Sequence, residues 1–162
     1  MKAPRIGHGF DVHAYTDGDG IVLGGAHIPC DKAIIAHSDG DVVIHALCDA
    51  MLGALGRGDI GRLFSDQDSL NQDRDSREFL RAVTALMHDD GYCLGNIDIT
   101  LIAQTPRLAP HVDTMRRLLA EDLQCDSSRI NVKATTTERL GFIGREQGIA
   151  AEAVVLLQAD LI

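Results

Sequence analysis

Three residues have side chains and positions that could hold a metal ion together. Asp11 and His13 flank Val12 on a predicted strand, so both side chains point to one face. His45 lies three residues after Val42, on the apolar side of the helical segment that follows. One carboxylate and two imidazoles leave one position of a tetrahedral zinc ion open, as in catalytic sites. The alternatives are a polar strand edge and a core histidine that finds a partner.

A second group of residues has the chemistry of a phosphate site. His37 and Ser38 directly precede the helical segment, where a hydroxyl, free amides and the helix dipole can hold an anion. Helix capping explains Ser38 equally well. Residues 134–138 (ATTTE) offer three hydroxyls and a carboxylate, although threonines also favour strands. Glu138 would repel phosphate unless a hard cation such as Mg²⁺ or Mn²⁺ stood between them.

Two further features could bind polar groups of a ligand. The segment 59–61 (DIG) closes the first helical region, and the acid of Asp59 could either bind ribose-like hydroxyls or belong to a turn. Arg107 and Arg145 each lie next to Pro or Gly and are candidate cations for an anionic ligand, although most arginines are simply solvated.

Composition excludes several classes of protein. The 162 residues include 15 Lys and Arg against 24 Asp and Glu, a formal net charge of −9 that argues against nonspecific binding to nucleic acid or anionic membranes. Aromatic residues make up only 4%, without Trp, so a base-stacking platform is not expected. The four cysteines form no Cys-x-x-Cys pair and predict free thiols. With no long apolar run and no leader pattern, we expect a cytoplasmic protein without a membrane segment.

Hydrophobic periodicity predicts the elements that must position these residues. A Gly-rich turn at 16–20 predicts a hairpin between the strands on either side of it. Ser38 is expected to cap the first helix, with Asp41 three residues later. The polar segment 64–77 is expected to be mobile. The predicted strands are 5–15, 21–28, 96–104, 130–136 and 149–157, and the predicted helices are 42–56, 75–91 and 110–123.

The element order β-β-α-α-β-α-β-β predicts an α+β fold, a mixed β-sheet with helices on one face. No repeat or linker interrupts the chain, so residues 1–162 are expected to form a single domain. The last strand is apolar on both faces, so the face without helices also needs cover. Self-association would supply that cover.

Four segments occur in one order and together are highly specific: 5–13 (RIGHGFDVH), 36–41 (AHSDGD), 59–61 (DIG) and 133–138 (KATTTE). In this the chain closely resembles the 2-C-methyl-D-erythritol 2,4-cyclodiphosphate synthases over nearly its whole length. The resemblance implies a phosphorus-oxygen lyase of the non-mevalonate isoprenoid pathway. Such an enzyme converts 4-diphosphocytidyl-2-C-methyl-D-erythritol 2-phosphate into 2-C-methyl-D-erythritol 2,4-cyclodiphosphate and CMP. It also implies that the single domain is a cyclodiphosphate synthase domain.

The resemblance also implies roles for individual residues. Asp11, His13 and His45 would hold Zn²⁺, and Glu138 would help to hold Mg²⁺ or Mn²⁺ at the phosphates. His37 and Thr136 match positions assigned to transition-state stabilisation. The implied substrate-binding residues are Asp11, His13, His37, Ser38, Asp59, Ile60, Gly61, Phe64, Ser65, Asp66, Gln67, Asp68, Ala103, Gln104, Thr105, Pro106, Arg107, Leu108, Ala109, Ala134, Thr135, Thr136, Thr137, Glu138, Phe142 and Arg145.

The implied assembly is a homotrimer with active sites between subunits. The cytidine of the substrate would bind residues 103–109 and 134–136 of the neighbouring subunit. Phe10, Phe142 and Arg145 would line the trimer axis, where isoprenoid diphosphates bind in some members. The chain departs from the family at 64–68, which reads FSDQD where many relatives have Phe-Pro-Asp-x-Asp and a later Lys, and at Arg107, where Lys is common.

Two other readings of the same residues remain open. A zinc hydrolase of small phosphoesters would use Asp11, His13 and His45 to activate water and would cleave without cyclisation. A noncatalytic trimer that binds a nucleotide or an isoprenoid diphosphate would depend on residues 103–109 and Arg145 but tolerate loss of the metal ligands.

Overall fold

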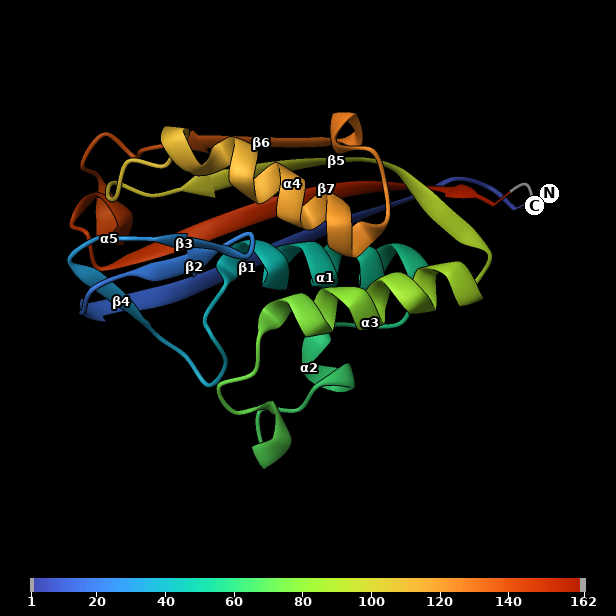
Figure 1. Ribbon diagram of the computed structural model, residues 1–162, viewed down its shortest axis with the longest axis horizontal. Coiled ribbons are helices and arrows are strands. Elements are labelled where there is room, and N and C mark those ends of the chain that lie inside the picture. Colours follow the sequence, from blue (N-terminus) through green and yellow to red (C-terminus); the bar gives the residue numbers. More distant parts are fainter. Residues whose placement is uncertain (1, 161–162) are drawn as a thin grey trace.

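The computed structural model describes residues 2–160 as a mixed five-stranded sheet with helices on one face (Figure 1). The strand order is β4-β1-β7-β5-β6, in which β5 and β6 are parallel and every other pair is antiparallel. The strands are β1 (Arg5–Asp17), β4 (Lys32–Ile35), β5 (Tyr92–Ile102), β6 (Ile130–Thr135) and β7 (Gly148–Ala159), with β2 (Ile21–Leu23) and β3 (Ala26–Ile28) in a separate pair. The helices are α1 (Val42–Leu55), α2 (Ile60–Leu63), α3 (Ser76–Asp89), α4 (Val112–Leu123) and α5 (Gly141–Gly144), with 3-10 turns at Ser69–Asn71, Ala109–His111 and Ser127–Arg129.

The core lies between the sheet and its helical layer. Helix α1 packs on β1 and β7, α4 packs on β6, and α3 lies against both α1 and α4 (Figure 1). The predicted α+β fold is therefore confirmed. On the opposite face of the sheet, Ile6, Phe10, Val12 and Val154 are between 41% and 76% exposed in the single chain. This open apolar face is the one that the sequence predicted to need cover.

Two glycines let α1 approach β1 very closely. A Cβ atom added at Gly7 or Gly9 would lie 1.8 Å from the carbonyl oxygen of Ala50 or Ala46, respectively. Both glycines face the helix, as do Asp11 and His13 farther along the strand. The sequence therefore places His45 of α1 directly against the part of β1 that carries the two other candidate ligands.

The cap of α1 differs from the prediction. Asp41, not Ser38, is the N-cap, because its carboxylate accepts a hydrogen bond from the amide of Ile44 at 3.1 Å. The same fully buried carboxylate accepts from Gly24 and Gly25 at 2.9 and 2.7 Å, and so ties the β2–β3 turn to the helix. Ser38 is thereby left free for another role.

The predicted hairpin of 5–15 with 21–28 is wrong. Residues 21–28 fold back on themselves as β2 and β3, because Gly24 and Gly25 adopt φ values of 56° and 78° and form a tight turn. Strand β1 instead pairs with β4, an element that the sequence analysis missed, and with β7.

The other predicted elements are found with shifted ends. Helix α3 follows its predicted cap, Asp75, which accepts from the amide of Arg77 at 2.9 Å. Strand β5 begins four residues before 96, since Tyr92 and Leu94 are buried in the core, and it ends at Ile102. Pro110 lies in a 3-10 turn that leads into α4 rather than in the α-helix itself. Short helices α2 and α5 were not predicted. No helix among residues 2–160 is long and apolar enough to cross a membrane.

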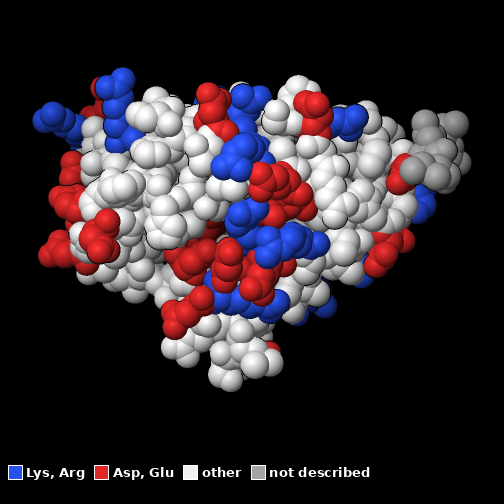
Figure 2. Space-filling view, viewed as in Figure 1, with Lys and Arg blue, Asp and Glu red and all other residues white. Residues whose placement is uncertain are grey.

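Acidic and basic side chains alternate over α3 and α4 on the face seen in Figure 2. Asp122, which is buried, pairs with Arg77 at 2.6 Å and with Arg81 at 3.0 Å. On α4, Arg117 pairs with Glu121 at 2.7 Å. The two pairs of Asp122 join α3 to α4, whereas the Arg117–Glu121 pair lies within α4. Together they leave no broad basic surface on this face.

Candidate active site

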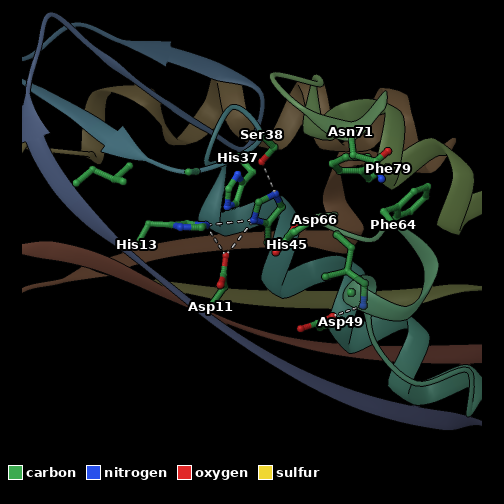
Figure 3. Close-up of a pocket in the computed structure, with 14 residues that line it drawn as sticks. Asp11, His13, His37, Ser38, His45, Asp49, Phe64, Asp66, Asn71 and Phe79 are labelled. Atoms are coloured by element: carbon green, nitrogen blue, oxygen red, sulfur yellow. Dashed lines mark hydrogen bonds and ion pairs between the residues drawn. The ribbon is translucent and has the colours of Figure 1, made fainter. Parts of the chain in front are cut away.

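Asp11, His13 and His45 meet at one point above the sheet (Figure 3). The Nε2 atom of His13 lies 3.0 Å from Oδ2 of Asp11, and Nδ1 of His45 lies 3.1 Å from the same oxygen. The two imidazole nitrogens are 3.2 Å apart. The alternation of β1 supplies the first two side chains, and the glycine contact between β1 and α1 supplies the third. The predicted convergence of these residues is confirmed.

The triangle has the size that a tetrahedral ion requires. Ligand atoms bound at about 2.0–2.1 Å around such an ion lie roughly 3.3 Å apart. The three distances between donor atoms, 3.0 to 3.2 Å, are close to that value. Two imidazoles and a carboxylate also form a donor set that suits zinc. The residues therefore fit a divalent metal with one position left for another ligand.

The charge of the site also favours a cation. Burial by itself would raise the pKa of Asp11, but hydrogen bonds with His13 and His45 outweigh it and lower the pKa to about 2. Burial opposes protonation of His45, yet the hydrogen bond and charge of Asp11, with the charges of Asp41 and Asp39, raise its pKa above 6.5. An excess of negative charge therefore surrounds the point where the three side chains meet.

The far side of the His45 ring contacts two serines. Its Nε2 atom lies 3.0 Å from Oγ of Ser76 and 3.2 Å from Oγ of Ser38. Ser76 is fully buried at the start of α3, whereas Ser38 lines the open pocket. The imidazole is thus held on both sides, with Nδ1 directed at Asp11 and His13.

A pocket of about 290 Å³ opens above the triad. His37 and Ser38 both line this pocket, and Figure 3 shows them next to the ring of His45. The lining residues come from β1, the 35–38 segment, α1, α2, the 64–71 segment and α3: Asp11, His13, Ile35, Ala36, His37, Ser38, His45, Asp49, Ile60, Gly61, Phe64, Asp66, Asn71 and Phe79. The structure thus brings His37, Ser38, Ile60, Gly61, Phe64 and Asp66 to the triad.

Helix α2 is held over the pocket by two acids. Asp59 caps α2 by accepting from the amide of Arg62 at 3.0 Å. Asp49 of α1 accepts from the amide of Ile60 at 2.8 Å. Burial and the nearby charges of Asp59 and Asp11 raise the pKa of Asp49, although the bond from Ile60 opposes this. Ser65, Gln67 and Asp68 lie beside this region in an exposed turn and do not line the pocket.

The sequence analysis did not predict Asp49, Asn71, Ser76 and Phe79 as site residues, nor the pocket-lining Ile35 and Ala36. Asp49 lies one helical turn after His45, so the spacing on α1 could have revealed it. Ser76 and Phe79 are likewise one turn apart on α3, and Phe79 packs on Phe64 with ring centroids 4.5 Å apart. Asn71 had no signal, because only the path of the 64–75 segment brings it back to the pocket.

The other predicted substrate residues form a second group at the ends of β5 and β6. Asp11, Ala151, Leu101 and Ala134 lie in one row across four adjacent strands. Three strand spacings of about 4.8 Å separate the row's ends by roughly 14 Å. Among the described residues, none from 103–109 or 134–138 therefore lines the pocket of the same chain.

This second group has its own internal contacts. Gln104 accepts from the amide of Arg139 at 3.0 Å, and Thr136 accepts from the amide of Glu138 at 3.2 Å. Glu138 has a φ of 52° in this exposed turn. Phe142 and Arg145, in and after α5, are exposed, whereas the side chains of Ala103 and Leu108 belong to the core. Ala103 and Leu108 would therefore offer a ligand mainly their backbone.

Fold and site together define a class: an α+β protein whose Asp-His-His cluster, of a kind that could hold a metal ion, lies on the helix-covered face of the sheet. A model of the YgbB family matches residues 4–158. A 2-C-methyl-D-erythritol 2,4-cyclodiphosphate synthase of Thioalkalivibrio sulfidiphilus is 59% identical over 159 residues, 98% of this chain and 99% of the relative. The synthase of Haemophilus influenzae is 56% identical and covers 94% of this chain and 97% of the relative. The chain therefore belongs to the YgbB family, to which it aligns over nearly its full length.

Solved structures of relatives have the same fold as this chain. IspF of Plasmodium falciparum, in complex with CDP, superimposes with a TM-score of 0.87 and 36% identity over 99% of both chains. The bifunctional IspDF of Campylobacter jejuni gives a TM-score of 0.93 and 43% identity, covering 97% of this chain and 42% of that one. The present chain thus corresponds to less than half of the bifunctional protein.

Proposed function

We propose that this protein converts 4-diphosphocytidyl-2-C-methyl-D-erythritol 2-phosphate into 2-C-methyl-D-erythritol 2,4-cyclodiphosphate and CMP. One observation carries the proposal: the Asp11–His13–His45 triangle opens into a pocket bordered by His37 and Ser38. A diphosphate would find there a metal-type centre, a hydroxyl and an imidazole. The relatives named above are synthases of this cyclodiphosphate.

The reaction needs little from the side chains beyond position and charge. An oxygen of the 2-phosphate attacks the β-phosphorus, the bond between that phosphorus and CMP breaks, and its electron pair leaves with CMP. The attacking phosphate is already ionised at neutral pH, so the step needs no side-chain base. His37 and Thr136 would stabilise charge on the reacting phosphates, and Ser38 would donate its hydroxyl to a phosphate oxygen.

Asp11, His13 and His45 would hold Zn²⁺, which would supply Lewis acidity and charge neutralisation to a diphosphate oxygen. Asp59 and Gly61 would bind the erythritol part of the substrate. Phe64 and Asp66 would limit the entry of water from the side of the 64–68 loop. Excluding water favours ring closure over hydrolysis. This is why we prefer cyclisation to the hydrolase alternative.

Glu138 would help to bind Mg²⁺ or Mn²⁺ shared with the substrate phosphates, since such ions commonly take one or two carboxylates plus phosphate oxygens. Glu138→Gln is expected to weaken the dependence of turnover on added Mg²⁺ while leaving Zn²⁺ binding intact. A metal titration at fixed substrate measures this. An unchanged Mg²⁺ titration would remove the role of Glu138.

The spacing within one chain supports a homotrimer with shared sites. The Asp11 row puts Ala134 roughly 14 Å away on the same chain. Residues 103–109 and 134–138 would then serve the site of a neighbouring subunit. Those residues would bind the cytidine end of a substrate whose diphosphate lies at the neighbour's triad. Phe10, Phe142 and Arg145 would line the trimer axis and could hold an isoprenoid diphosphate.

We propose that the chain is one cyclodiphosphate synthase domain acting in the non-mevalonate isoprenoid pathway, as a phosphorus-oxygen lyase. All four cysteines are free, which supports a reducing compartment such as the cytoplasm.

Phosphorus NMR of the protein with the diphosphocytidyl substrate and Mg²⁺, with and without a zinc chelator, tests the function. We expect CMP and a cyclic diphosphate in equal amounts, and loss of both after chelation. Open-chain phosphates would instead indicate the hydrolase. No turnover with intact CMP binding would indicate a binding protein.

A further inference from the structure

We propose that Ser76 is a positioning residue that orients His45 for metal binding, and that Asp39 fixes the direction of its hydroxyl. Neither residue lines the pocket, and neither belongs to the ligand triangle. The inference rests on the proposed metal site and adds two residues to it.

The contacts of Ser76 determine where its hydroxyl hydrogen goes. Asp39 accepts from the backbone amide of Ser76 at 2.9 Å and from its hydroxyl at 2.5 Å. A carboxylate can only accept hydrogen bonds, so the hydroxyl hydrogen of Ser76 points to Asp39. The lone pairs of the Ser76 oxygen are then left for Nε2 of His45, 3.0 Å away.

This direction selects one tautomer of His45. Because Ser76 offers Nε2 only an acceptor, its contact favours a ring hydrogen on Nε2. In the metal-free protein Nδ1 shares a hydrogen with Asp11. Once that hydrogen is lost, Nδ1 presents a lone pair beside Asp11 and His13, which is the state that binds a metal. A hydrogen bond from the second ring nitrogen commonly fixes a metal-binding histidine in this way.

Ser38 is a poorer partner for Nε2 of His45 than Ser76 is. Its oxygen is farther from Nε2, at 3.2 Å, and already accepts from the amide of Gly40 at 3.3 Å. Ser38 also lines the pocket, where a phosphate would compete for it. Ser76, by contrast, is 0% exposed and reaches no solvent or ligand. Of the two serines, the buried one is the dedicated partner of the imidazole.

The test compares Zn²⁺ affinity, measured by competition with a chromophoric chelator, in the wild-type protein, Ser76→Ala and Ser76→Thr. We expect Ser76→Ala to raise the Kd for Zn²⁺ about 10- to 100-fold, and Ser76→Thr, which keeps the hydroxyl, to recover most of the affinity. Thr84→Ala is the matched control, because it removes a buried hydroxyl of the same helix that bonds only to the carbonyl of Leu80.

A second measurement detects the hydrogen bond itself. In the Zn²⁺-loaded protein, the Nε2–H proton of His45 should give a slowly exchanging NMR signal. Ser76→Ala should shift that signal and speed its exchange, whereas Thr84→Ala should not.

Wild-type affinity in Ser76→Ala, or equal weakening in Ser76→Thr and Thr84→Ala, would overturn the inference. Its failure differs from failure of the proposed function. A wild-type protein that neither binds Zn²⁺ nor cyclises the substrate would sink the function, whereas a fully active wild type with an unaltered Ser76→Ala would sink only the role of Ser76.

Discussion

The candidate site depends on a small number of atoms whose charge state is set by their neighbours. Asp11 illustrates this, because its carboxylate is partly buried and still ionises readily, with a pKa of about 2 against an ordinary value of 3.8. The cause is the pair of imidazoles that bond to it. Protons would therefore compete with any metal ion for the two imidazoles and the carboxylate.

At this scale we predict an acid dependence of stability in the metal-free protein. A lowered pKa in the folded state stabilises the fold above the unfolded value, and this contribution is lost as the pH falls from about 4 towards 2. The loss should be roughly 1–2 kcal/mol. Urea unfolding between pH 5 and 2 measures it, and Asp11→Asn should reduce the slope. An equal slope in both proteins would contradict the prediction.

At the scale of elements, the contact between β1 and α1 is what assembles the triad. Gly9 lets the helix backbone approach the strand, and the fully buried Asp41 fixes where the helix begins. Helix α3 then supplies Ser76 behind His45 and Phe79 beneath the pocket. The site is therefore built largely on regular elements, with the 59–71 segment as its outer wall.

We expect Gly9→Ala to separate α1 from β1 and to lower both stability and metal affinity. The new methyl group would lie 1.8 Å from the carbonyl oxygen of Ala46, so the backbone must move. The free energy of unfolding should fall by about 3 kcal/mol. Gly53→Ala is the control: Gly53 lies in α1, a Cβ atom there would meet nothing within 4 Å, and the change should stabilise the protein by about 0.5–1 kcal/mol. Thermal unfolding and Zn²⁺ competition measure both effects. Normal Zn²⁺ affinity in Gly9→Ala would contradict this account.

At the scale of the whole molecule, the sheet has two different faces. One is covered by helices, and the other exposes Ile6, Phe10, Val12 and Val154. Large exposed apolar side chains gathered on one face often mark an interaction surface, although His8 and Glu152 lie among these. With the two groups of predicted substrate residues roughly 14 Å apart in one chain, the open face is where we propose that the subunits meet.

Val154→Lys should therefore abolish self-association and turnover but leave Zn²⁺ binding intact. Val154 is 48% exposed on β7, away from the triad, so a charge there would be buried only in an assembly. Val154→Ile is the control that keeps the surface apolar. Sedimentation at micromolar concentration, with turnover measured in parallel, gives the result. A trimeric Val154→Lys would place the interface elsewhere.

The sequence by itself determined much of the local structure and the chemistry of the site. Alternation along 5–15 put Asp11 and His13 on one face, and the helical period put His45 on the buried side of α1. These are periodicities of covalent geometry, so they can be read from spacing alone. The family segments that include Asp11, His13 and Ser38 indicated the function without knowledge of tertiary contacts.

Only the tertiary structure decided what lies between distant segments. It replaced the expected hairpin with β1–β4 and β1–β7 pairs, gave the cap of α1 to Asp41, and put Asp49 and Ser76 at the site. Strand partners and buried hydrogen bonds depend on long-range packing, which local propensity does not encode. For the same reason, the distance between the two groups of substrate residues emerged only from the order and register of the strands.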